Sequence, residues 1–230
     1  MTVRAISIFV LVLFASLGVT PRAEADPIVS LDPSNLGIGT LATAFDPTTN
    51  TLVLVEDWTS VLMGSVLISG LDPGVDYTVV KQITNNTGTT WTRLANELLD
   101  PAGDLNDDSD PQPYPAFVPA GFSTSNDLDG LSFAQGSGLP RVSDKFASVF
   151  EDELSDARDF LDFFNGTVLN GESFIVTYGL RDNTGVNQPF LLVQRPNTQS
   201  RQPVIPEPAT MFLVGGGLTA LVRRRLKRKQ

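Results

Sequence analysis

The chain has 230 residues, of which 41% are hydrophobic, so it is long enough for one or two domains with a buried core. It contains neither cysteine nor histidine, which excludes disulfide scaffolds, Cys/His zinc sites, cysteine nucleophiles and Ser-His triads. The net charge is −10, and residues 26–205 hold 8 basic against 24 acidic residues, which argues against binding to nucleic acid. The composition therefore favours a protein that is not an enzyme.

The first 25 residues have the organisation of an export signal. Arg4 precedes an apolar run over residues 5–19, which a proline ends, and Ala23 and Ala25 form a small-x-small cleavage site. This order is typical of a signal peptide, so we expect signal peptidase to release a mature chain that begins near Asp26. The alternative is a buried first helix.

Residues 26–194 predict one acidic, mainly β domain. Residues 77–84 alternate, with Tyr77, Val79, Lys81 and Ile83 on one face, which indicates a strand with one face more buried. Further short runs rich in β-branched and aromatic residues lie at 51–55, 61–68, 128–133, 168–169, 173–178 and 190–194. Turn signals separate them at 72–74, 86–88, 170–171 and 183–185. Many short strands of this kind indicate an antiparallel β-sandwich or a jelly roll.

Residues 143–164 carry a pattern that fits two structures. Apolar residues recur there at spacings of three and four, which favours an amphipathic helix. Residues 160–164, followed by Asn165-Gly166, also suit a strand. We expect one short helix before about Ser155 and a strand after it.

The densest polar cluster could be a calcium site. Its alternating oxygen ligands match the opening of a calcium loop: Asp104, Asn106, Asp108 and, two residues on, Asp110. The remainder departs from an EF-hand, because Ser109 stands where glycine is needed and Pro115 where glutamate is needed. A solvated acidic loop is the alternative, and no other cofactor is expected.

Two further groups of residues have a functional and a structural interpretation. The carboxylates between Glu151 and Asp162 could serve glycoside hydrolysis, although such a run usually marks a solvated face. Trp58 and Trp91 could stack on sugar rings, although core packing is the more common role of tryptophan in a β domain.

The end of the sequence has three parts after a proline-rich linker at 195–205. Pro206, Glu207 and Pro208 come first, and the prolines keep this segment out of helices and sheet ladders. An apolar segment at 209–222 follows, which would span about 21 Å as a helix against a bilayer core of about 30 Å. The basic tail at 223–230 would stay on the cytoplasmic side. A plain membrane anchor is one interpretation of this arrangement.

Residues 206–230 as a whole resemble the PEP-CTERM sorting signal of exported proteins of Gram-negative bacteria. The resemblance rests on Val204 to Thr210, on the glycine-containing apolar run and on the arginine-rich tail with Arg223, Arg224 and Arg225. It implies that an exosortase, a membrane enzyme, recognises Pro206-Glu207-Pro208 and removes the hydrophobic tail. It also implies a transient inner-membrane intermediate and a final place at the cell surface, in the outer membrane or in the extracellular matrix.

The sequence thus predicts an exported surface or matrix protein associated with exopolysaccharide or biofilm. A surface-anchored carbohydrate-binding module and a secreted hydrolase that uses carboxylates are the alternatives.

Overall fold

A computed structural model describes residues 26–102, 118–124, 130–134, 136–152, 159–183 and 189–198 of the chain. Across these ranges the chain forms thirteen strands and no helix. The strands are β1 (Ile28–Leu31), β2 (Ile38–Asp46), β3 (Thr51–Trp58), β4 (Gly64–Ser69), β5 (Asp76–Asn85), β6 (Trp91–Pro101), β7 (Phe122–Thr124), β8 (Leu131–Ser132), β9 (Val142–Ser143), β10 (Phe146–Asp152), β11 (Phe160–Val168), β12 (Ser173–Asp182) and β13 (Phe190–Pro196).

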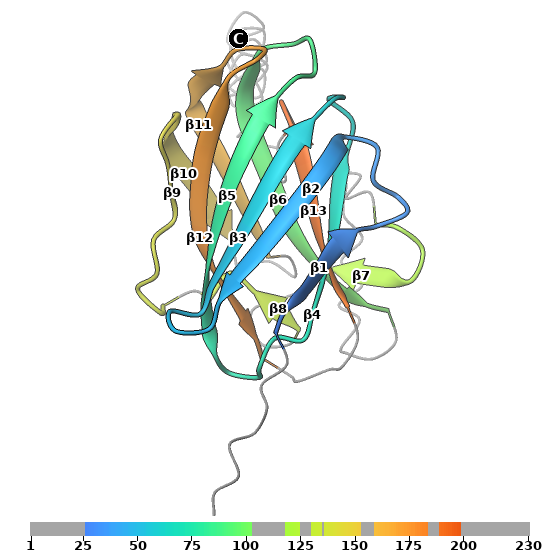
Figure 1. Ribbon diagram of the computed structural model, residues 1–230, viewed down its shortest axis with the longest axis vertical. Helices are drawn as coiled ribbons and strands as arrows, with labels where there is room; N and C mark the ends of the chain where they lie inside the picture. Colours follow the sequence, from blue (N-terminus) through green and yellow to red (C-terminus); the bar gives the residue numbers. More distant parts are fainter. Residues whose placement is uncertain are drawn as a thin grey trace, which may run out of the picture.

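The strands form two sheets that face one another (Figure 1). One sheet has the order β1-β4-β13-β6-β11-β10, with β7 added to β6. The other has the order β2-β3-β5-β12-β8, with β9 added to β12. The pairs are antiparallel except for β3 and β5, which run parallel. The predicted β-sandwich is therefore confirmed.

Strand β5 shows why the alternation in the sequence was informative. Tyr77, Val79, Lys81 and Ile83 are all buried, at 2% exposure or less, whereas the residues between them face outward. Strand β3 beside it alternates in the same way, with Leu52, Leu54, Glu56 and Trp58 turned inward. Because side chains alternate across a strand, one buried face selects every second residue.

The short helix expected before Ser155 is wrong in the part that the structure describes. Residues 146–152 form strand β10, which pairs with β11 over the register from Phe146↔Gly166 to Asp152↔Phe160. The strand expected after Ser155 is confirmed as β11. Pairing at the edge of a sheet has overridden the helical spacing, since the aromatic residues of this segment find partners across strands.

Two long strands were not predicted, β2 and β6. Strand β6 contains Leu94-Ala95-Asn96-Glu97-Leu98-Leu99, which does not alternate, because residues 94–101 are buried on both faces. A strand that is covered on both sides carries no period-two signal. Strand β13 also continues to Pro196, two residues past the expected end of the domain at 194.

The core between the sheets is rich in aromatic rings. Trp91 makes T-shaped contacts with Trp58 at 5.2 Å and with Phe174 at 6.1 Å between ring centroids, and Phe146 packs on Phe174 at 5.5 Å. These contacts join β3 and β12 of one sheet to β6 and β10 of the other. They bury large apolar areas and fix the distance between the sheets.

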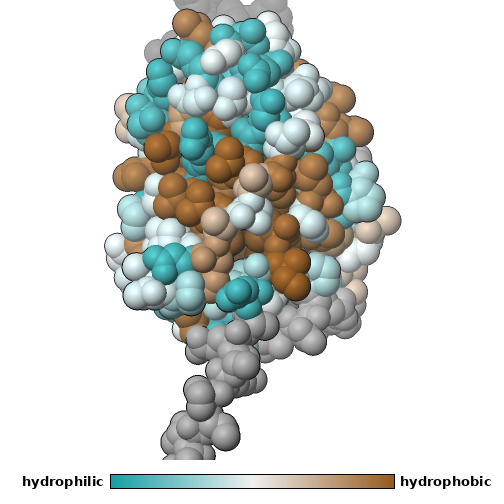
Figure 2. Space-filling model, in the orientation of Figure 1, coloured by the Kyte–Doolittle hydropathy of each residue, from teal (hydrophilic) through white to brown (hydrophobic). Residues whose placement is uncertain are grey.

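The outer face of the sheet in front in Figure 1 carries an apolar stripe. Figure 2 shows apolar residues gathered over the middle of the face that β2, β3 and β5 form. Val55 and Ile175 on this face are 40% and 44% exposed. None of the described residues forms a helix that is long and apolar enough to span a membrane.

Candidate functional site

The two tryptophans proposed for sugar stacking lie in the core. Trp58 and Trp91 are both 0% exposed, so neither indole offers a face to a ligand. Trp58 Nε1 donates to Glu56 Oε2 at 3.0 Å, and Trp91 Nε1 donates to Thr87 Oγ1 at 3.1 Å. The sugar-stacking interpretation is therefore wrong, and the core-packing alternative holds.

The indole of Trp58 is hydrogen-bonded to a buried polar cluster, which we define as Glu56, Lys81 and Gln194. All three side chains are 0% exposed. Lys81 Nζ lies 3.1 Å from Glu56 Oε1, and Gln194 Nε2 donates to the same Oε1 at 3.0 Å. Lys81 Nζ also donates to Gln194 Oε1. Each of the three side chains thus contacts the other two, and Trp58 occupies the remaining carboxylate oxygen.

Both sheets contribute to this polar cluster. Glu56 comes from β3 and Lys81 from β5, which are neighbours in one sheet, and Gln194 comes from β13 in the other. Gln194 stands opposite Gly64 of β4, where a Cβ would overlap the Trp58 indole. The glycine therefore leaves the room that the tryptophan and the glutamine need between the sheets.

Burial governs the protonation of the cluster. Removal from water lowers the pKa of the Lys81 ammonium, while the charge and the hydrogen bond of Glu56 act in the opposite direction. Tyr178 on β12 is affected too, since burial, followed by the charge of Glu56, raises the pKa of its hydroxyl well above the usual value. The Tyr178 hydroxyl has no hydrogen-bond partner among the described residues.

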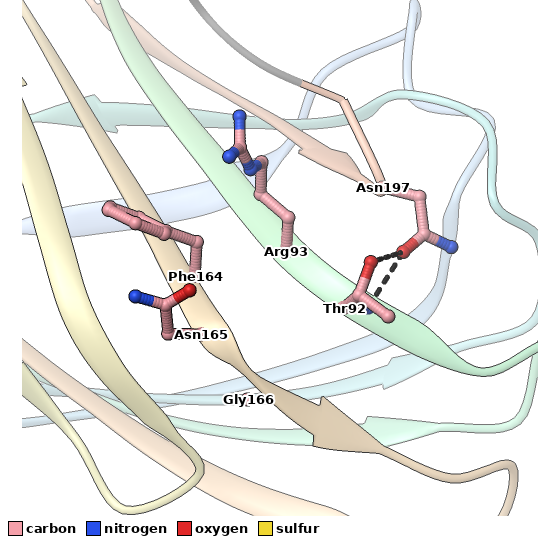
Figure 3. A pocket seen from close by; sticks show the side chains of 6 residues that line it. All are labelled: Thr92, Arg93, Phe164, Asn165, Gly166 and Asn197. Atoms are coloured by element: carbon pink, nitrogen blue, oxygen red, sulfur yellow. Dashed lines mark hydrogen bonds between the residues drawn. The ribbon is translucent and has the colours of Figure 1, made fainter.

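A shallow groove of about 340 Å³ lies on the other sheet, where β6 and β11 meet the end of β13 (Figure 3). Thr92, Arg93, Phe164, Asn165, Gly166 and Asn197 line it. The Arg93 guanidinium lies 5.2 Å from the centre of the Phe164 ring, a cation–π contact. Asn197 Oδ1 accepts hydrogen bonds from the backbone N–H of Thr92 at 2.8 Å and from its hydroxyl at 3.4 Å.

Amide, hydroxyl, guanidinium and aromatic groups are the ones that bind sugars and carboxylates in proteins. No pattern in the sequence indicates this groove, because its residues come from β6, from β11 and from Asn197 just after β13, and these segments meet only in the tertiary structure. The sequence does not indicate the buried cluster either, although the alternation in residues 77–84 places Lys81 on the buried face of its strand.

The acidic band between Glu151 and Asp162 is divided by the fold. Glu151 is paired with Arg141 at the surface, with the glutamate side chain 38% exposed. Asp159 and Asp162 are buried, and Asp162 Oδ2 lies 4.0 Å from Arg93 Nη1. The interpretation of the band as one solvated face is therefore wrong for Asp159 and Asp162.

The remaining predicted sites lie outside the described residues. They are the calcium ligands Asp104, Asn106, Asp108 and Asp110, the cleavage site at Ala23 and Ala25, and the sorting residues Pro206, Glu207, Pro208, Arg223, Arg224 and Arg225. Within the described ranges, no group of three or more acidic side chains is arranged to hold a metal ion.

Comparison with protein families found a match to the PEP-CTERM protein-sorting motif over residues 204–228. A search of curated proteins and a search of solved structures found no match for the chain. The matched residues include Pro206-Glu207-Pro208, the apolar segment and most of the basic tail. The motif implies export, processing by an exosortase and direction to the cell surface. The chain therefore carries a PEP-CTERM protein-sorting motif at residues 204–228, and a β-sandwich domain precedes this motif.

Proposed function

We propose that this protein is a non-enzymatic component of the cell surface or extracellular matrix, where its β-sandwich associates with exopolysaccharide or biofilm material. The observation that carries the proposal is the short distance between domain and motif. Asn197 is still bonded to Thr90 and Thr92 of the domain, and the matched motif begins at residue 204.

This spacing limits how far the domain can stand from the sorting site. From Thr198 to Pro206 there are eight peptide steps, which reach at most about 26–29 Å when fully extended at roughly 3.3–3.6 Å each. The domain would therefore be held near the membrane while exosortase acts on Pro206-Glu207-Pro208. A compact sandwich on a short tether suits a domain that becomes part of a surface layer.

The processing half of the proposal is tested by the intact mass of the protein recovered from cell surface and medium. We expect two cuts, one near Ala25 and one near the start of the motif. Glu207→Ala should leave the tail attached and the protein in the membrane, because the recognised carboxylate is gone. Gln202→Ala, a change in the linker just before the motif, is the matched control and should be processed normally. Normal processing of Glu207→Ala would contradict the proposal.

Carbohydrate binding at the groove is a second candidate function. The aromatic ring of Phe164 beside Arg93, Asn165 and Asn197 favours it, because a ring and several polar groups converge on one open surface. Such a groove suits an acidic sugar, which would pair with the guanidinium.

The test is binding of exopolysaccharide isolated from the producing cells to the purified domain-bearing chain. Phe164→Ala and Arg93→Ala should each weaken binding at least several-fold. Phe150→Ala, which removes a 44% exposed ring elsewhere on the same sheet, should not. Equal binding by all three variants would locate the contact outside the groove.

A further inference from the structure

We propose that Lys81 and Gln194 become joined by an isopeptide bond, an amide between the two side chains, with release of ammonia and with Glu56 as the group that moves the protons. The inference concerns the core of the domain and does not depend on the proposed function. It would make the sandwich covalently closed across its two sheets.

The three reacting groups already touch one another. Lys81 Nζ, the nucleophile, contacts the carboxamide of Gln194 through its oxygen, which is one bond from the carbon to be attacked. Glu56 Oε1 lies 3.1 Å from Lys81 Nζ and 3.0 Å from Gln194 Nε2, the nitrogen that would leave. One carboxylate oxygen therefore reaches both the atom that loses protons and the atom that gains one, as general acid–base catalysis requires.

The surroundings favour the neutral, reactive form of the amine. All three side chains are fully buried, and burial lowers the pKa of Lys81. Transfer of one proton from the ammonium to Glu56 replaces a buried ion pair with a neutral amine and a neutral acid. A desolvated lysine of this kind is a recognised nucleophile toward carbonyl carbon. Because the groups are held in place, the reaction needs no encounter step.

The step balances without any further reagent. The lone pair of Nζ attacks Gln194 Cδ and forms a tetrahedral intermediate. Glu56 gives its proton to Nε2, takes one from Nζ, and the Cδ–Nε2 bond breaks to release ammonia. The products are the amide between Lys81 and Gln194, one ammonia molecule and Glu56 in its acid form, and neither atoms nor charge are lost.

The neighbouring carboxamides are committed to other contacts. Asn96 faces Gln194 across β6 and β13, but its Nδ2 donates to the backbone oxygen of Leu161 at 3.2 Å. Asn85 Nδ2 donates to the backbone oxygens of Thr89 and Val168. Lys145, the other lysine among residues 26–205, pairs with Glu172 at the surface. The geometry thus singles out one lysine and one carboxamide.

The position of the bond matters for a tethered protein. Gln194 lies on β13, the last described strand, which leads to the sorting motif. A load applied through residues after Pro196 would act first on β13. A bond to β5, 113 residues earlier in the sequence, would transfer that load to the opposite sheet.

The decisive measurement is a tryptic digest of the full chain, followed by mass spectrometry. If the bond forms, trypsin cannot cleave after Lys81, and the peptide that ends at Arg93 is joined to peptide 182–201. The joined species should be lighter than the two linear peptides by one ammonia molecule, and fragment spectra should place the link at Lys81 and Gln194. Cleavage after Lys81 with a free, unmodified peptide 182–201 would overturn the proposal without any variant.

Variants then assign the roles. Lys81→Met should abolish the ammonia loss, and Lys145→Arg, the matched control, should retain it in full. Glu56→Gln keeps the size of the side chain but cannot exchange protons, so formation of the bond should slow by about 10²–10⁴-fold. An unchanged rate in Glu56→Gln would overturn the role of Glu56, and ammonia loss that persists in Lys81→Met would overturn the proposed bond.

Discussion

Lys81 and Glu56 are charged residue types in a core that otherwise consists mostly of apolar side chains. Taking two charges out of water is costly, and their mutual attraction offsets that cost only when the remaining hydrogen-bonding groups are also satisfied. Here Trp58 and Gln194 supply those contacts to Glu56. The four residues therefore depend on one another, and removing Lys81 alone would leave an uncompensated acid between the sheets.

Tyr178 gives a prediction at the scale of one residue. Its buried hydroxyl has no hydrogen-bond partner among the described residues, so Tyr178→Phe should leave stability unchanged or raise it by about 1–3 kcal/mol. Tyr77→Phe is the contrasting control, because the Tyr77 hydroxyl accepts the Asp72 backbone N–H at 2.9 Å. That variant should lose about 1 kcal/mol. Urea unfolding at neutral pH compares the two, and a clear loss in Tyr178→Phe would contradict the prediction.

Tyr178 should also make the free energy of unfolding fall with pH in the alkaline range. The pKa of Tyr178 is raised in the folded state, so the folded protein keeps a proton that the unfolded chain releases at about pH 10. Its contribution is therefore fully present below about pH 10 and is lost as the pH rises through the folded-state pKa. Tyr178→Phe should flatten this alkaline fall. Identical pH profiles of unfolding for the variant and the natural chain would count against it.

At the scale of elements, the turn between β11 and β12 is the clearest local structure. It is not a hairpin, because β11 pairs with β6 and β10 in one sheet and β12 pairs with β5 in the other. Val168 ends β11 and Ser173 begins β12, which confirms the turn expected at Asn170-Gly171. Gly171 has a φ of +85°, in the region that favours glycine. Asn170 Oδ1 also accepts the backbone N–H of Gly88 at 2.7 Å, so this turn is joined to the loop after β5.

Gly171→Ala should therefore destabilise the domain by about 1–2 kcal/mol. Nothing lies within 4 Å of a Cβ built there, so the effect would come from backbone conformation alone. Gly171→Asn is the matched control, since asparagine tolerates this region better, and it should lose less. Denaturation midpoints of both variants check the order, and equal losses would contradict a cost that comes from backbone conformation.

At the scale of the whole molecule, the proposed bond between Lys81 and Gln194 acts mainly on the unfolded chain, because it restricts the conformations that the unfolded chain can adopt. By analogy with a disulfide that closes a loop of about 100 residues, the link should stabilise the fold by about 4–5 kcal/mol. It should also keep the denatured state compact, which lowers the dependence of unfolding free energy on denaturant.

Glu56→Gln should consequently show both a lower midpoint and a steeper denaturant dependence than Lys145→Arg. A lower midpoint with an unchanged slope would indicate only lost contacts in the core, without a link in the natural chain.

The sequence by itself determined the features that depend on neighbouring residues. Alternation in 77–84 placed Lys81 on a buried face, Asn170-Gly171 marked a turn, and Pro206-Glu207-Pro208 with its apolar and basic segments marked the sorting motif. Each of these signals is local, because a strand face, a turn and a linear recognition motif are defined within a few residues.

Only the tertiary structure decided the rest. It made 146–152 a strand despite its helical spacing, and it made β6 a strand that carries no alternation because both its faces are covered. It also brought Gln194 to Lys81 and Glu56, and Arg93 to Phe164 and Asn197. These contacts join segments up to 138 residues apart, and such pairings follow from how whole sheets stack, which no local pattern encodes.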